Sequence, residues 1–334
     1  GILIMQVSKF KNLPKIELHL HLDCSLSYDV VKKIDPTVDI KHYKSSFQAG
    51  ESCSSLKDYL KCADNAIELM QTKENLQFIV EDLFKQLHDD NVIYAEIRFA
   101  PLLHCEGDLN AKKVVDIICM SALIQSKKYN IDYGLILCTL RHYSEDESLK
   151  TVKLVKEFSE KGVVGFDIAA DEAGYPIDNH IKAFTYAKNN NLNITAHAGE
   201  AKGSESIWET INKLYAKRIG HGVRCLEDKK LVKFLSDNNY HLEICLTSNI
   251  KTNTFNSFIN HPMNEIYDSS ISLSINTDGR AISNTSLSKE YAIAHSELNW
   301  STEKIIQSNL NAIEHAFTTN EKKEKLRKHL KSFS

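Results

Sequence analysis

Along the chain, short apolar runs alternate with longer stretches in which apolar residues recur every three or four positions. The short runs predict β-strands and the longer stretches predict amphipathic helices. Eight strands are expected, over Ile16–His21, Val92–Phe99, Tyr133–Leu140, Val163–Ile168, Asn193–His197, Arg218–His221, Leu242–Leu246 and Ile271–Asn276.

Charged helical stretches separate consecutive strands, for example "ESLKTVKLVKEFSEK" after the third run. Strands that alternate with helices favour a parallel sheet with right-handed crossovers. Eight such units predict an α/β fold, a closed (β/α)8 TIM barrel, as one domain over residues 1–334. The alternative is an open doubly wound sheet, but the chain contains neither G-x-G-x-x-G nor G-x-x-x-x-G-K-[ST].

The connection after the first strand, from about Leu26 to Asn91, is too long for a single crossover. It predicts extra helices inserted after the first strand. Insertions at the carboxyl end of a barrel often build a lid over the site. The helical stretch Leu56–Met70 therefore has two interpretations, a lid or ordinary packing on the barrel exterior.

Within the first strand, the segment "ELHLHLD" carries His19 and His21 between leucines. Residues i and i+2 of a strand share a face, so the two imidazoles are expected to point to one side and the leucines to the other. Buried imidazoles need partners. From this fragment alone they are either core histidines bonded to carbonyls or metal ligands.

Polar residues also end or follow the later strands. His197 ends the fifth strand and Glu200 follows it, His221 ends the sixth, and Asp278 follows the eighth. Singly, each could be a packing, capping or surface residue. Together with His19 and His21, these residues are expected at one end of the barrel. Three histidines and a carboxylate from this group suit zinc or a similar divalent metal. Glu200 and His221 are then left for proton transfer.

The chain of 334 residues carries 41 basic and 44 acidic residues, a formal net charge of −3. This balance excludes the electrostatic footprint of a nucleic-acid or anionic-membrane binder. The eight cysteines form no C-x-x-C pair, so a thiolate zinc site is not expected. Without a signal peptide or a long apolar run, the sequence predicts a soluble cytoplasmic protein that takes a small-molecule partner.

In this order, "KIELHLHLD", "TAHAGE", "IGHG" and "SINTD" resemble the adenosine deaminase family of metal-dependent amidohydrolase barrels. "AEIRFAP", "GFDIAADE", "EICLTSN" and "NAIEHAF" agree with this resemblance, which spans Leu13 to about Phe317. The combination is specific, whereas H-x-H alone is not.

The resemblance implies one zinc ion (Zn2+) per chain and a role for each matching residue. Its zinc ligands correspond to His19, His21, His197 and Asp278. Glu200 resembles the proton donor to purine N1, and His221 the residue that orients and helps deprotonate the attacking water. Asp23 resembles the residue that binds the ribose 5′-hydroxyl, and the Ala170 position offers a backbone N–H to purine N3.

The implied activity is hydrolysis of adenosine and 2′-deoxyadenosine to inosine and ammonia, with a metal-bound hydroxide attacking purine C6 and purine salvage as the expected pathway. The alternatives are deamination of another adenine compound, such as adenine, 5′-methylthioadenosine or aminodeoxyfutalosine, and a non-catalytic nucleoside-binding barrel. Asp23 favours a free 5′-hydroxyl, because a carboxylate repels a 5′-phosphate.

Three positions depart from the family pattern. Cys24 and Ala170 stand where many members have glycine, and Gly279 stands where some members have a second aspartate that binds purine N7. Two further strand-end features are expected to be supporting. The pair Ser248-Asn249 is a candidate hydrogen-bond partner of His221, and Arg98 has either a structural role, which we favour, or a role behind the site.

Overall fold

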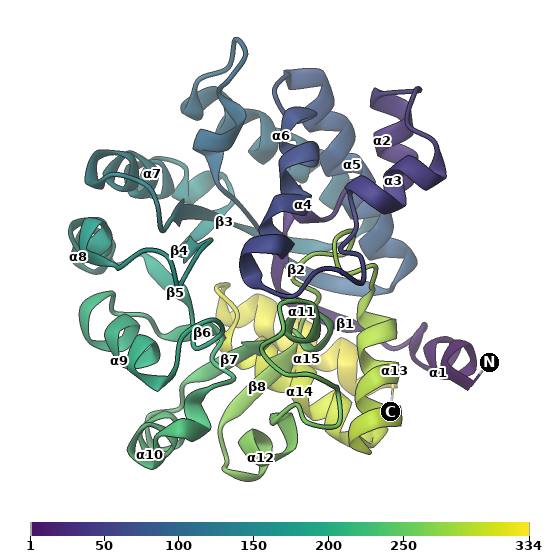
Figure 1. The fold of residues 1–334 in the computed structure, drawn as a ribbon, viewed down its shortest axis with the longest axis vertical. Coiled ribbons are helices and arrows are strands. Elements are labelled where there is room, and N and C mark those ends of the chain that lie inside the picture. The colour runs from purple at the N-terminus through teal and green to yellow at the C-terminus, as the bar shows by residue number, and fades with distance from the viewer. Residues whose placement is uncertain (1, 334) are drawn as a thin grey trace.

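The computed structural model describes residues 2–333, and in it the predicted barrel is present. Eight parallel strands form one sheet in sequence order, each paired with the next, and helices surround it (Figure 1). The strands are β1 (Lys15–His21), β2 (Val92–Phe99), β3 (Asp132–Leu140), β4 (Val163–Ala169), β5 (Asn193–Ala198), β6 (Arg218–His221), β7 (His241–Ile244) and β8 (Ser272–Ile275). The (β/α)8 TIM-barrel prediction is confirmed.

The predicted strand ends differ from the observed ends by at most two residues. The largest difference is at β7, which ends at Ile244 because Leu246 begins a short helix instead of continuing the strand. The helices are α1 (Ile2–Phe10), α2 (Tyr28–Ile34), α3 (Ile40–Ser46), α4 (Leu56–Glu68), α5 (Lys73–Asp89), α6 (Ala111–Tyr129), α7 (Glu145–Glu157), α8 (Ile181–Asn189), α9 (Ser204–Lys213), α10 (Lys229–Asp237), α11 (Leu246–Lys251), α12 (Met263–Asp268), α13 (Leu287–Leu298), α14 (Thr302–His315) and α15 (Asn320–Phe333).

Side chains of β1 alternate as the sequence predicts. Leu18 packs in a cluster with Ile313 of α14, on the outer side of the strand. His19 points the other way and contacts Glu243 of β7 and Asp278 inside the barrel. The apolar face thus joins the strand to the helical layer, and the polar face is left for the barrel interior.

The barrel closes between β1 and β8 through the backbone of Asp278. The N–H of Asp278 donates to the His19 carbonyl (2.9 Å), and the N–H of His21 donates to the Asp278 carbonyl (2.8 Å). A parallel bridge joins Leu20 to Asp278. The residue that supplies a carboxylate to the site therefore also closes the barrel at the same end.

Further along this seam, side chains replace main-chain pairing. The N–H of Leu18 donates to Asn276 Oδ1 and the N–H of Ile16 to Asn309 Oδ1, each at 2.8 Å. Glu17 accepts the N–H and hydroxyl of Thr277. The first two bonds satisfy buried amides of β1, and the Glu17 bonds satisfy the buried donors of Thr277.

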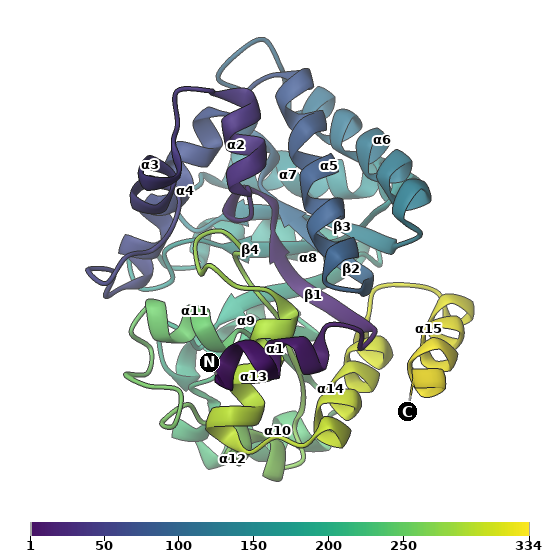
Figure 2. The ribbon, with the colours of Figure 1, turned by 90° about the vertical axis from the view of Figure 1, so that its right-hand side faces the viewer.

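The long first connection forms α2, α3, α4 and α5, which confirms the predicted extra helices. In the side view, α2 to α5 lie together at one side of the barrel (Figure 2). Helix α4 begins at Ser55, whose side chain accepts the N–H of Asp58, and it buries Tyr59, Ala63 and Ala66. This spacing gives α4 one apolar face.

No helix within residues 2–333 is long and apolar enough to cross a membrane.

We predict that Asn309→Ala lowers the free energy of unfolding by about 1–3 kcal/mol, because it leaves the buried Ile16 N–H without an acceptor. Asn309 also accepts the Tyr291 hydroxyl (3.0 Å), so two donors lose their partner. Urea unfolding measures the change. Gln307→Ala, an exposed change on the same helix, is the control. Equal unfolding midpoints for the two variants would contradict the role of Asn309 in the seam.

Candidate active site

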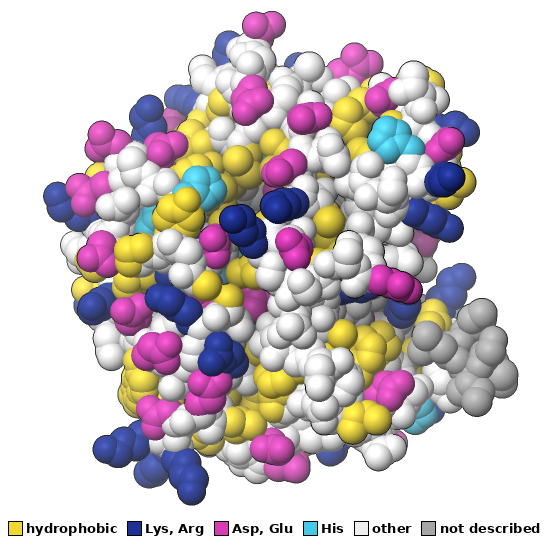
Figure 3. Space-filling model, in the orientation of Figure 1, with side chains coloured by type: hydrophobic (Ala, Val, Ile, Leu, Met, Phe, Trp, Pro, Cys, Tyr) yellow, Lys and Arg dark blue, Asp and Glu magenta, His cyan; other side chains and the backbone are white. Residues whose placement is uncertain are grey.

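A cavity of about 270 Å³ lies at the carboxyl ends of the strands. It is lined by His21, Asp23, Cys24, Leu56, Tyr59, Leu60, Ala63, Asp64, Ile67, Leu103, Leu140, His142, Ala169, Ala170, Asp171, His197, Glu200, His221 and Asp278. Figure 3, in the orientation of Figure 1, shows apolar side chains among charged groups of both signs on this face of the molecule. Because α4 supplies one wall, the interpretation of Leu56–Met70 as a cover for the site agrees with its position.

The structure brings the candidate metal ligands together at the floor of this cavity. One ligand atom from each of His19, His197, His221 and Asp278 lies within 4.8 Å of the others, and all four residues are buried. His21 lies at the edge of this group, with its Nε2 3.1 Å from His197 Nε2 and 3.3 Å from Asp278 Oδ1. The four-residue group thus contains three of the predicted ligands, His19, His197 and Asp278, together with His221, and the fourth predicted ligand, His21, lies beside it.

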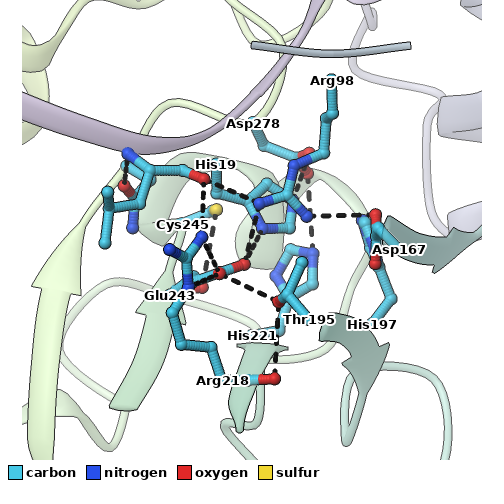
Figure 4. Close-up of polar contacts among 12 residues, drawn as sticks. His19, Arg98, Asp167, Thr195, His197, Arg218, His221, Glu243, Cys245 and Asp278 are labelled. Carbon is cyan, nitrogen blue, oxygen red and sulfur yellow. Dashed lines mark hydrogen bonds and ion pairs between the residues drawn. The ribbon is translucent and has the colours of Figure 1, made fainter. Parts of the chain in front are cut away.

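Two buried carboxylates orient the imidazoles from behind. Glu243 Oε1 lies 2.9 Å from His19 Nδ1, and the Asp167 carboxylate lies 3.0 Å from His197 Nδ1 (Figure 4). A carboxylate at Nδ1 fixes the ring and directs Nε2 to the opposite side. Both Nε2 atoms therefore face the cluster.

Arg98 bridges these two carboxylates. Its guanidinium donates to Asp167 and to Glu243, each at 3.0 Å, and Arg218 also binds Glu243 (Figure 4). Burial raises the pKa of Glu243, but Arg98 and Arg218 outweigh it and hold the pKa well below its usual range. Arg98 therefore lies directly behind the histidines and holds the carboxylates that orient them, which is the alternative to the purely structural role that the sequence favours.

The chemistry of the donor set fits a cation. The Nε2 atoms of His21 and His197 face each other at 3.1 Å, and His19 Nε2 lies 3.1 Å from Asp278 Oδ1. Burial lowers the pKa of His21 well below its usual value, which favours the neutral imidazole. Imidazole nitrogens and a carboxylate that converge on one buried point are donors that a divalent metal accepts.

Glu200 enters the cavity from the turn after β5. Its Oε2 is buried without a hydrogen-bond partner and lies 3.3 Å from His221 Nε2, outside hydrogen-bond geometry. Burial, followed by the charge of Asp278, raises the pKa of Glu200 well above its usual value. A carboxyl group that keeps its proton at neutral pH can donate it to a ligand.

His221 is fixed by a hydrogen-bond relay that starts at a backbone amide. The N–H of Met263 donates to His261 Nδ1 (3.2 Å), so His261 Nε2 carries the hydrogen toward Asn249 Oδ1 (2.9 Å). The Asn249 amide nitrogen then donates to His221 Nδ1 (3.1 Å). Because Nδ1 accepts, the neutral His221 ring carries its hydrogen on Nε2, toward the cluster.

The predicted contact of Asn249 with His221 is confirmed, whereas the neighbouring Ser248 binds a different residue. Its hydroxyl donates to Asp278 Oδ2 at 2.7 Å. Sequence reasoning missed His261 and the carboxylates Asp167 and Glu243. The two carboxylates had a signal, since each is a charged residue inside an apolar strand run, and such buried charges need a partner.

Asp23 and Ala170 both line the cavity, at separate positions. Burial raises the pKa of Asp23 to about 6, and Cys24 Sγ donates to its Oδ1 at 3.6 Å. Ala170 has a φ of 78°, a left-handed conformation that costs a residue with a Cβ more than it costs glycine. Its methyl group occupies cavity space that a glycine would leave free.

Gly279 and Cys24 compete for one space. A Cβ on Gly279 would lie 2.8 Å from Cys24 Cβ and 2.7 Å from the Tyr59 hydroxyl. The next residue, Arg280, points elsewhere: its guanidinium donates to Asp90 and to Gln86, each at 3.1 Å, and none of these three residues lines the cavity. The side chain missing at position 279 is thus replaced in space by Cys24 and Tyr59.

Comparison with known proteins agrees with this site. Residues 14–333 match the family model for adenosine deaminase. A protein of Clostridium acetobutylicum named adenosine deaminase is 36% identical over 326 residues, covering 96% of this chain and 97% of the relative.

Two solved structures share the fold. An N6-mAMP deaminase of Arabidopsis has a TM-score of 0.87 at 26% identity, over 97% of this chain and 99% of that chain. An adenine deaminase of Arthrobacter aurescens has a TM-score of 0.89 at 21% identity, over 96% and 99%. The family model and the relative at 36% identity show that the chain belongs to the adenosine deaminase family of hydrolytic purine deaminases.

Proposed function

We propose that this protein is a zinc-dependent deaminase of adenosine and 2′-deoxyadenosine, and that residues 1–334 form its single catalytic domain. The observation that carries the proposal is the buried Glu200 carboxyl group, whose Oε2 has no hydrogen-bond partner, beside the cluster of histidines and Asp278. The proposed zinc ligands are His19, His21, His197 and Asp278, with His221 directed at the space above them. A bound zinc ion supplies Lewis acidity, which makes water acidic enough to attack at neutral pH.

The residues of the chain handle the protons in the proposed reaction. Glu200 gives its proton to purine N1, so that the ring accepts electrons as a water oxygen adds to C6. Of the two water hydrogens, one completes the leaving ammonia and the other returns to Glu200. The His221 Nε2–H points toward the cluster, which suits a hydrogen bond that orients the attacking oxygen.

The remaining cavity residues suit a nucleoside. Asp23 is proposed to bind the 5′-hydroxyl and the Ala170 N–H to bind purine N3. Among the described residues that line the cavity there is no Lys or Arg, whereas Asp64 and Asp171 add to the carboxylates. An unpaired phosphate beside these groups is unfavourable. This favours adenosine over a nucleotide such as the N6-mAMP named for the Arabidopsis neighbour.

The first test is a substrate panel on protein of known metal content, with ammonia release as the measurement. We expect rapid turnover of adenosine and 2′-deoxyadenosine, and slow turnover of adenine, 5′-methylthioadenosine and adenosine monophosphate. Asp23→Asn should narrow the preference for adenosine over its monophosphate, because it removes one repelling charge. Equal turnover of adenosine and its monophosphate by the unaltered protein would overturn the role of Asp23.

The second test separates proton transfer from metal binding. Glu200→Gln should lower kcat by roughly 10²–10⁴-fold because it removes the general acid, with metal content unchanged. Asp278→Ala should lower the metal content measured by atomic emission, because a ligand is lost. If Asp278→Ala kept full metal occupancy, another group would have to be the fourth ligand, and near-normal kcat in Glu200→Gln would exclude the proposed donor.

The third test addresses the shared space of Cys24 and Gly279. Gly279→Asp should lower both the melting temperature and kcat/KM, because its Cβ has no room. Cys24→Gly should be milder, and adding it to Gly279→Asp should restore part of both quantities. A thermal shift assay and the deaminase assay on all four proteins measure this coupling. Purely additive losses would show that the two side chains do not compete.

A further inference from the structure

Glu172, in the turn after β4, binds the backbone that carries Glu200. Its carboxylate accepts four consecutive N–H groups, from Gly199 (2.8 Å), Glu200 (3.1 Å), Ala201 (2.7 Å) and Lys202 (3.1 Å). Its Oε2 also accepts the hydroxyl of Ser206 at 2.5 Å. Glu172 is buried, with 1% of its surface exposed.

This arrangement is an anion-binding concavity formed by the turn between β5 and α9. Successive N–H groups that point to one side form such a concavity, and here the occupant is a side chain of the same protein. Gly199 makes the turn possible with a φ of 69°, where a Cβ would lie 2.5 Å from Ile207. Without the carboxylate, these amides would lose their charge-assisted acceptor in a buried environment.

The Glu200 side chain has little else to hold it in place. Its Oε2 has no hydrogen-bond partner, and the neighbouring His221 Nε2, at 3.3 Å, lies outside hydrogen-bond geometry. The position of this carboxyl group in the cavity therefore depends on the backbone of residues 199–202, and that backbone converges on Glu172.

We propose that Glu172 is a positioning residue for Glu200: it fixes the turn after β5 so that the Glu200 carboxyl group meets the purine ring. This inference rests on the proposed function. Glu172 itself does not line the cavity and does not touch the substrate. A purely structural role, as an anchor for α9, is the alternative that the experiment has to separate.

A double-mutant cycle of Glu172→Gln and Glu200→Gln separates the two roles. Glutamine keeps the size of the side chain but loses its charge and one of its acceptor oxygens. We expect Glu172→Gln to lower kcat for adenosine by roughly 10²-fold, the effect of a misplaced catalytic group. The KM should change little and the metal content not at all. Added to Glu200→Gln, it should cause almost no further loss of kcat, because the group that it positions is already absent.

Asp82→Asn is the matched control. Asp82 also accepts a backbone N–H and a hydroxyl, both from Ser27, but it lies on α5 and does not line the cavity. This variant should lower the melting temperature and leave kcat unchanged. The positioning role is wrong, and Glu172 is only structural, if Glu172→Gln lowers the melting temperature but leaves kcat unchanged. The same conclusion follows if it lowers kcat by the same factor in the wild-type protein and in Glu200→Gln.

Hydrogen exchange of the amides of residues 199–202 gives a readout that needs no activity. We expect Glu172→Gln to speed their exchange while strand amides of β5 stay protected. Unchanged exchange would overturn the proposal. If Glu172→Gln does not fold, Ser206→Ala serves as the second variant, because it removes one donor to Glu172 and should loosen the turn less. A wild-type protein without adenosine turnover would refute the proposed function, and the exchange result would still decide whether Glu172 holds the turn.

Discussion

The architecture of the site depends on how the barrel interior accommodates buried charge. Arg98 lies between Asp167 and Glu243, and those carboxylates hold the Nδ1 atoms of His197 and His19. A buried ion pair is costly unless its geometry is good and the remaining lone pairs are satisfied, so the members of this network restrict one another. The imidazole orientations follow from that restriction.

Closure of the barrel and placement of the site share the same atoms. The backbone of Asp278 joins the ends of β1 and β8, with a φ of 64° that turns its side chain over the histidines. His221 also has a positive φ, 67°, at the end of β6. Strained backbone at two adjacent cluster residues is characteristic of sites where the surrounding fold fixes a functional geometry. The hydrogen bonds of the seam and of the His261–Asn249 relay supply that constraint here.

Sequence patterning was enough for the barrel, the inserted helices and the polar strand-end residues that meet at one end of the barrel, because strand periodicity and strand-end position are local properties. It could not supply the partners behind those residues. Asp167 lies 69 residues after Arg98 in the sequence, and Glu243 lies 145 residues after it. Only the closed barrel brings the three side chains together. The contact between Glu172 and the turn at Gly199 similarly joins two strand ends whose spacing in the sequence carries no signal.

The departures from the family pattern show the same dependence on spatial context. Taken one at a time, Cys24 and Gly279 read as an added thiol and a lost carboxylate. In the structure they face each other at a distance where two side chains cannot both fit, and the Tyr59 hydroxyl occupies the rest of that space. Tyr59 comes from α4, within the insertion that forms one wall of the cavity. The space beside Gly279, after β8, is thus filled by Cys24 from the turn after β1 and by Tyr59 of the inserted helix, and both of these residues line the cavity.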